Sequence, residues 1–158
     1  MNGTIFQINS SPGGVPKLAR LEGLVTPDGL EGDAQRNTIS HGGPMRALCL
    51  YSLERILALQ AEGHPIFPGA AGENLTLSGL PWEAMTPGTR WRLGEEADIE
   101  ITKYCTPCSH LTAFFLEGEF NRIHQEKRPG WSRVYARVLA SGRIRTGAPI
   151  RFLGRPEA

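Results

Sequence analysis

Glycine and proline divide this chain into many short segments, and this division constrains its fold more than any other feature of the sequence. Nineteen glycines and twelve prolines make up about a fifth of the 158 residues, where average usage is roughly 12%. They occur in pairs and triplets along the whole chain, as at 12–14, 42–44, 68–69 and 87–88. Turn residues spread in this way indicate many short elements that reverse direction, and they argue against a disordered tail.

Short apolar runs between these turns predict β-strands. The runs have four to six residues with apolar side chains at alternate or consecutive positions, which is typical of strands. They lie at 3–8, 46–51, 74–77, 89–93 and 98–102. Near the C-terminus, apolar residues alternate over 133–140, and Ser141-Gly142 then leads to further runs at 143–145 and 150–152. This pattern predicts a hairpin whose arginines share one side of the sheet.

Helical periodicity is present in two places. Residues 52–62 have Ser52 as a candidate N-cap and an apolar stripe, and Gly63 follows as a stop signal. The second region runs from about 109 to 127 and contains Gly118, so it predicts two short helices. Seven or more strands with two or three short helices indicate a mainly β fold, a barrel with helical excursions. The length suits a single domain over residues 1–158.

Cys105 and Cys108 form a C-x-x-C pair in the segment KYCTPCSHL. Structural zinc usually needs four Cys or His ligands, and the sequence has no second C-x-x-C or H-x-x-x-H. Thiol redox chemistry fits the local strand-then-helix pattern, but the βαβ alternation is missing elsewhere. A third use is a thiolate at a helix start that binds a heavier metal. Simple packing is the plain alternative, and for Cys49, inside an apolar strand, it is preferred.

A glycine-rich loop offers a second candidate site. His41, Gly42, Gly43 and Arg46 lie together in Ser-His-Gly-Gly-Pro-Met-Arg. Backbone amides and cationic side chains suit a phosphate or another oxyanion, although tight turns of a barrel also need glycines.

A third candidate lies in residues 68–75, Pro-Gly-Ala-Ala-Gly-Glu-Asn-Leu. The turn places Glu73 and Asn74 at the head of a predicted strand. An amide such as that of Asn74 can bind the edge of a heterocycle, but it can also cap its own turn. Both uses remain open from the residues alone.

Charge and composition exclude several classes of protein. The formal net charge of +1 does not indicate a nucleic-acid binder. Residues 122–155 carry nine basic residues against one acid, so this part faces either an anion or solvent. We expect a cytoplasmic protein with reduced thiols, because there are three cysteines and neither a secretory signal nor an apolar run long enough to cross a membrane.

The motifs in their order resemble those of the MOSC domain, named for the C-terminal domain of molybdenum cofactor sulfurase. The resemblance covers essentially the whole chain, as in the small stand-alone MOSC proteins of bacteria. It rests on S-P-G-G-V-P-K at 11–17, G-L-E-G-D at 29–33, H-G-G at 41–43, Arg46, Leu50-Tyr51, Pro68-Gly69, G-E-N-L at 72–75 and Pro107-Cys108.

The resemblance implies a barrel related to the pyruvate kinase β-barrel that binds molybdenum cofactor, a molybdopterin with a phosphate and a dithiolene-bound metal. In the family one cysteine binds the metal or carries sulfur, and Cys108 matches it. The residues expected to line the pocket are His41, Gly42, Gly43, Arg46, Glu73 and Asn74.

The expected chemistry is reduction of N-hydroxylated small molecules, such as N-hydroxylated base analogues, with electrons from a separate reductase. The alternative is a non-catalytic carrier of the cofactor or its sulfur, which would need a cofactor-delivery protein as its partner. A C-x-x-C zinc or thiol-redox protein ranks third. Pyridoxal phosphate is not expected, because nothing singles out one of Lys17, Lys103 and Lys127 for an aldehyde.

Overall fold

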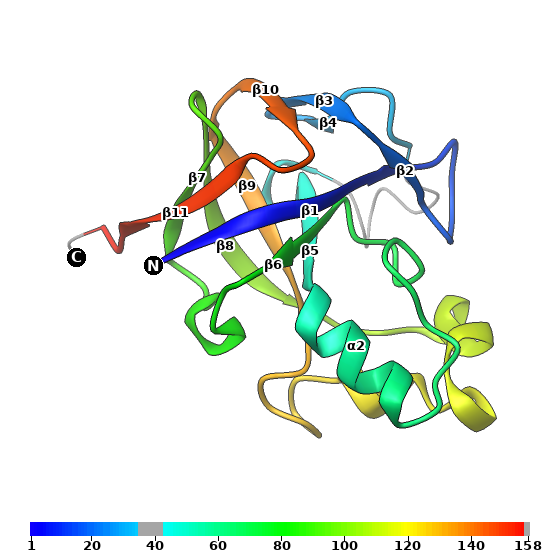
Figure 1. The fold of residues 1–158 in the computed structure, drawn as a ribbon. Coiled ribbons are helices and arrows are strands. Elements are labelled where there is room, and N and C mark those ends of the chain that lie inside the picture. Colours follow the sequence, from blue (N-terminus) through cyan, green and yellow to red (C-terminus); the bar gives the residue numbers. More distant parts are fainter. Residues whose placement is uncertain (35–42, 157–158) are drawn as a thin grey trace.

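The computed structural model describes residues 1–34 and 43–156, and its ribbon is a curved sheet closed into a barrel (Figure 1). Neighbouring strands follow the order β11-β7-β8-β9-β5-β6-β1, and pairing of β1 with β11 closes the ring. The barrel strands are β1 (Asn2–Ser10), β5 (Leu48–Ser52), β6 (Leu75–Ser78), β7 (Arg90–Leu93), β8 (Ala97–Cys105), β9 (Arg133–Ala140) and β11 (Pro149–Gly154). The expectation of a mainly β, barrel-like fold is therefore confirmed.

Strand pairing in the barrel is antiparallel except between β5 and β6. A parallel pair needs a crossover connection, and the helix α2 (Leu53–Ala61) lies in the one between β5 and β6. Ser52 caps this helix as predicted, since its hydroxyl accepts a hydrogen bond from the Arg55 amide at 3.1 Å. Gly63 follows with a φ of 100°, a value that favours glycine.

A smaller sheet corrects one prediction. Its order is β10-β3-β4, with β3 (Glu22–Thr26), β4 (Gly29–Leu30) and β10 (Gly142–Arg145), while β2 (Leu18–Arg20) pairs with the end of β1. The predicted hairpin between 133–140 and 143–145 is wrong. Strand β9 pairs with β5 and β8, whereas β10 leaves the barrel and pairs with β3. The turn at Ser141-Gly142 therefore joins two sheets instead of two neighbouring strands.

The hydrophobic core fills the barrel interior. Alternate residues of each strand point inward, which explains the alternating burial along β7 and the first half of β8. The largest fully buried side chains of this interior include Trp91, Ile5, Ile8, Leu48, Leu50, Leu75, Leu77 and Leu93. Burial of a large apolar side chain contributes about 1.5–3 kcal/mol. These contacts hold the strands that frame the candidate site.

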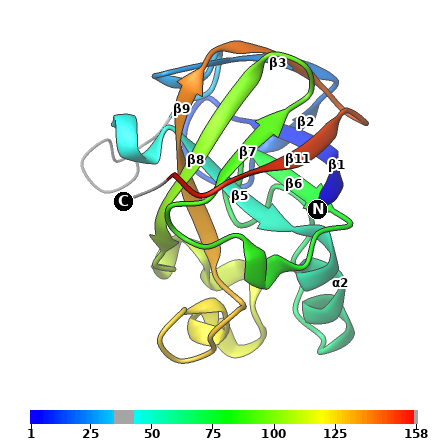
Figure 2. The ribbon, with the colours of Figure 1, turned by 90° about the vertical axis from the view of Figure 1, so that its left-hand side faces the viewer.

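Residues 106–132 run beside α2 at one end of the barrel (Figures 1 and 2). They contain the 3-10 helices η3 (Ser109–Phe114), η4 (Leu116–Gly118) and η5 (Phe120–Ile123), where two short helices were predicted. Positive φ at Glu117 (54°) and Gly118 (68°) interrupts the helical path, so tight single turns form instead. Two further 3-10 helices are η1 (Pro44–Arg46) and η2 (Trp82–Ala84). In the part of the chain that the structure describes, no helix has the length and apolar character needed to span a bilayer.

Candidate functional site

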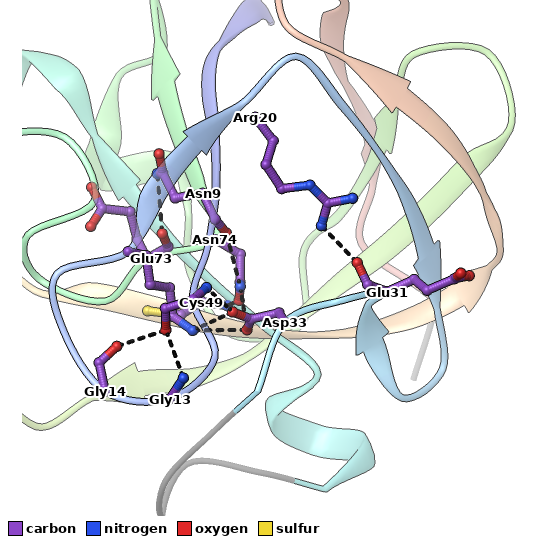
Figure 3. A network of polar contacts seen from close by, with 11 residues as sticks. Asn9, Gly13, Gly14, Arg20, Glu31, Asp33, Cys49, Glu73 and Asn74 are labelled. Carbon is purple, nitrogen blue, oxygen red and sulfur yellow. Dashed lines mark hydrogen bonds and ion pairs between the residues drawn. The ribbon is translucent and has the colours of Figure 1, made fainter.

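A buried ion pair ties three of the sequence motifs together on one side of the barrel. The Lys17 ammonium lies 2.7 and 2.8 Å from the two carboxylate oxygens of Asp33, and both side chains are less than 10% exposed. The Asn74 amide donates to the same carboxylate at 2.9 Å (Figure 3). The motifs G-G-V-P-K, G-L-E-G-D and G-E-N-L thus meet at one carboxylate, which fixes their loops relative to one another.

Asn74 extends the pairing of β5 with β6 by one residue. Its side-chain oxygen accepts a hydrogen bond from the Cys49 amide at 3.0 Å, and its own backbone amide donates to the Cys49 carbonyl at 2.7 Å. Since its side-chain nitrogen also binds Asp33, both ends of the side chain have protein partners. Asn74 therefore links the loop of Asp33 to Cys49 on β5. Its contact with a cofactor stays a prediction.

Glu73 is fully buried at the head of β6. One carboxyl oxygen accepts hydrogen bonds from the Gly69 amide and the Thr76 hydroxyl, at 3.1 and 3.0 Å, while the other has no hydrogen-bond partner in the described part of the chain. Burial raises the pKa of Glu73 above its ordinary value, and the hydrogen bonds and the charge of Arg133 only partly oppose this shift.

Four buried side chains form what we call the thiol floor: Cys49, Cys105, Arg133 and Tyr135. Cys49 is paired with Tyr135 across β5 and β9, and Cys105 with Arg133 across β8 and β9. Directly paired residues share one face of a sheet, as do residues two apart on a strand. The thiol floor therefore lies on the outer face of the barrel wall, opposite the core residues Val134 and Ala136.

Arg133 places a positive charge in the thiol floor near neutral pH. A hydrogen bond with Cys105, with burial second, raises the pKa of the Cys49 thiol, and burial raises the pKa of the Tyr135 phenol. Both groups therefore keep their protons. Burial opposes the charge of Arg133, yet the surrounding thiols, Tyr135 and Glu73 raise its pKa, so the guanidinium stays protonated.

Cys108 and Cys105 differ in accessibility. Cys105 is the last residue of β8 and is 1% exposed, whereas Cys108 is half-buried at the residue before η3. The Cys108 carbonyl accepts a hydrogen bond from the Leu111 amide at 3.0 Å, which holds the start of that turn. Of this C-x-x-C pair, Cys108 is therefore the thiol that an external ligand reaches more easily.

Arg46 covers one edge of the thiol floor. It ends η1, and its guanidinium carbon lies 5.7 Å from the centre of the Tyr135 ring. Gly43 directly precedes η1 with a φ of 90°. His41 and Gly42, predicted for the same loop, lie outside the described residues.

The structure brings Arg46, Glu73 and Asn74 around a floor that the sequence did not reveal. Arg133 was one of nine basic residues near the C-terminus, and only its pairing with Cys105 distinguishes it from exposed ones such as Arg143. The described residues contain no group of three or more His, Cys, Asp or Glu arranged to hold a metal ion. Binding through one thiolate needs no such group.

Comparisons with known proteins agree with this architecture. The chain is 34% identical over 131 residues to the uncharacterised protein YflK of Bacillus subtilis, covering 82% of this chain but only 58% of YflK. It is 33% identical over 163 residues to protein YiiM of Escherichia coli, covering 94% of this chain and 69% of YiiM. A protein named Reductase from Gibberella moniliformis is 31% identical over 133 residues, which cover 81% of this chain and 23% of that protein.

A solved structure and a family model complete the comparison. The crystal structure of Escherichia coli YiiM superposes with a TM-score of 0.72 at 28% identity, covering 100% of this chain and 72% of YiiM. The model of the MOSC domain matches residues 37–151, which include β5 to β10. Sequence motifs, barrel topology and family match thus agree, and the chain belongs to the MOSC domain family.

Proposed function

We propose that this protein binds molybdenum cofactor through Cys108 and catalyses the two-electron reduction of N-hydroxylated compounds, with electrons from a separate reductase. The observation that carries the proposal is a half-buried thiol that follows a strand whose outer face forms a buried, positively charged floor. A soft thiolate suits a soft metal that is already bound by sulfur.

The residues present fit the cofactor in charge and donor type. Molybdopterin is anionic, and the thiol floor holds a protonated Arg133 with Arg46 at its edge. Cys108 would hold the metal, while Arg46 and the loops at 11–17 and 69–74 would contact the rest of the molecule. His41, Gly42, Gly43, Glu73 and Asn74 remain the residues predicted to line this pocket.

When bound, the cofactor supplies a metal centre that exchanges two electrons. In the reaction, R–NH–OH takes up two electrons and two protons and yields R–NH2 and water. The chain's own contribution is to bind and orient. The Lys17–Asp33 ion pair and the Asn74 hydrogen bonds fix the loops, and the buried thiol floor excludes water beneath the ligand. Cys49 would not bind the metal, because its thiol keeps its proton and metals bind the thiolate form.

The comparisons support a MOSC protein related to molybdenum cofactor. A relative named reductase matches 81% of this chain, but the match covers only 23% of that longer protein. Because this chain spans 58% and 69% of YflK and YiiM, the substrate and the electron donor are proposals for the protein as a whole.

Metal content tests the proposal directly. Wild type, Cys108→Ala and the matched control Cys105→Ala are expressed in a host that makes molybdenum cofactor. Molybdenum is measured by elemental analysis and pterin by fluorescence after oxidation. We expect molybdenum and pterin in wild type and Cys105→Ala, and loss of molybdenum in Cys108→Ala. Zinc in proportion to protein, with neither molybdenum nor pterin, would overturn the proposal.

Turnover separates an enzyme from a carrier. Loaded wild type should reduce an N-hydroxylated base analogue when a chemical reductant replaces the partner, and Cys108→Ala should not. Transfer of cofactor to an acceptor apoenzyme without any turnover would instead support the carrier hypothesis.

A further inference from the structure

Arg133 is a buried cation with a hydrogen-bond donor that has no partner among the described residues. Arg133 is 5% exposed, and its guanidinium forms no ion pair with any described residue. One terminal nitrogen, Nη1, donates to the Ala71 carbonyl at 2.6 Å. The Nε atom is buried and has no hydrogen-bond partner within residues 1–34 and 43–156. Buried donors of this kind are rare in folded proteins and need a partner.

Cys105, opposite Arg133 on β8, interacts with its charge electrostatically, but no described carboxylate forms an ion pair with Arg133. Cys49 and Tyr135 keep their protons, as their raised pKa values indicate. Glu73 interacts with Arg133 electrostatically, but no nitrogen–oxygen contact within ion-pair distance joins them, and burial raises the pKa of this carboxyl. An arginine cannot lose its proton inside a protein, so the positive charge is permanent. A bound anion would supply a partner for the buried Nε donor.

The position of the unpartnered Nε donor also indicates how an anion would bind. The Nε and Nη2 atoms form the side edge of the guanidinium, which matches two oxygens of one carboxylate or phosphate. Nη1 is occupied by Ala71, so the side edge is the one with an unbonded donor. Arg46 provides a second cation above the Tyr135 ring.

We infer that Arg133 forms an oxyanion subsite in the thiol floor, which binds two oxygens of one oxyanion through its Nε edge. The subsite lies beside Cys105 on the strand that leads to Cys108. The oxyanion belongs either to the cofactor or to a free inorganic anion, and the two sources have the same chemistry. Only the first source rests on the proposed function.

Anion binding to cofactor-free protein tests this inference. Inorganic phosphate and molybdate are titrated into the full chain at constant ionic strength, with chloride as the balancing salt, and the shift in Tm is recorded. Wild type should show a saturable rise in Tm with either oxyanion and none with chloride. Arg133→Met should weaken binding roughly tenfold or more, the effect of losing a charge-assisted hydrogen bond.

Two further variants locate the site. Arg137→Met is the matched control, because Arg137 lies on the same strand but is paired with Glu100, and it should bind as wild type does. Arg133→Lys keeps the charge but loses the forked donor, so it should also bind the oxyanion more weakly than wild type. This variant tests the inference if Arg133→Met does not fold. Equal binding by wild type and whichever Arg133 variants fold would overturn the inference, as would the absence of a saturable shift in wild type.

Two measurements distinguish the oxyanion subsite from the metal site. Cys108→Ala should retain oxyanion binding even when it carries no molybdenum. In wild type, bound phosphate should slow alkylation of the Cys108 thiol by iodoacetamide, and an unchanged rate would place the anion elsewhere and refute the assignment. Pterin content of Arg133→Lys from a cofactor-producing host identifies the source. Its loss assigns the anion to the cofactor, and its retention assigns a free oxyanion.

Discussion

Glu73 is the residue whose titration should leave the clearest mark on stability. Burial raises the pKa of this carboxyl in the folded state, so between its unfolded and folded pKa values the folded protein holds the extra proton. Its contribution to stability is therefore fully present below the unfolded pKa and is lost as pH rises through the folded pKa. The loss amounts to about 1.4 kcal/mol for each pH unit that separates the two pKa values. Glu73→Gln should accordingly gain stability over wild type at pH 7 and lose this advantage near pH 4, as measured by urea unfolding.

Glu100 is the control with the opposite sign. Hydrogen bonds from Arg90 and Arg137 lower the pKa of its carboxyl, despite partial burial. Its contribution is present above the unfolded pKa and is lost as pH falls through the folded pKa. Glu100→Gln should therefore be less stable than wild type at pH 7, with a difference that shrinks on acidification. The same pH trend in both variants would contradict the buried environment of Glu73.

At this scale the sequence did not reveal what the candidate residues contact. Glu73 and Asn74 were predicted to line a pocket, which stays a prediction, and the structure shows that Asn74 is hydrogen-bonded to Asp33 and Cys49. Those partners are 41 and 25 residues away in the chain, so no local pattern reveals them. Cys49 was predicted to be a core residue, and it is buried, but in the thiol floor rather than in the main core.

At the scale of elements, the turn at Gly69 packs closely against the loop of Lys17. This glycine has a φ of 92°, and a Cβ built on it would lie 2.2 Å from the Lys17 carbonyl oxygen. Gly69→Ala should therefore cost more than the roughly 1–2 kcal/mol of a left-handed conformation, since the loop at 11–17 must also move. Urea unfolding measures this cost, and weaker molybdenum retention should accompany it.

Gly147 offers a matched control, because its φ is also 92° but a Cβ there would meet nothing within 4 Å. Gly147→Ala should cost about 1–2 kcal/mol only. The difference between the two variants isolates the contact between the loops. Equal losses would show that the Gly69 turn does not hold the loop of Lys17.

The sequence predicted strands better than their partners. Alternation of apolar residues located β1, β5 to β9 and β11, since it depends only on neighbouring residues. It could not show that β10 pairs with β3, because that choice depends on contacts about 120 residues apart. The short strands β2 and β4 have too few residues for any period. In residues 109–123 the apolar spacing suited a helix, but positive φ at Glu117 and Gly118 divides it.

At the scale of the whole molecule, the barrel and the segment of residues 106–132 should differ in local stability. The barrel wall is held by continuous backbone ladders, whereas this segment has short 3-10 turns. One of its attachments is Trp131, whose ring centre lies 3.9 Å from the guanidinium carbon of Arg122 and 4.8 Å from that of Arg55. Arg122 in turn forms two hydrogen bonds with Glu62 at the end of α2.

Trp131→Ala should therefore release the segment without opening the barrel. Loss of both cation–π contacts and of apolar burial should cost roughly 2–3 kcal/mol, and amide exchange in 109–131 should speed up at least tenfold by mass spectrometry, while β8 and β9 keep their protection. Phe152→Ala is the control, because Phe152 packs on Trp91 of the barrel wall and its loss should affect β7 and β11 instead. Faster exchange everywhere in Trp131→Ala would mean that the two parts unfold together. Selective exchange would mean that the segment after Cys108 opens on its own while the thiol floor stays in place.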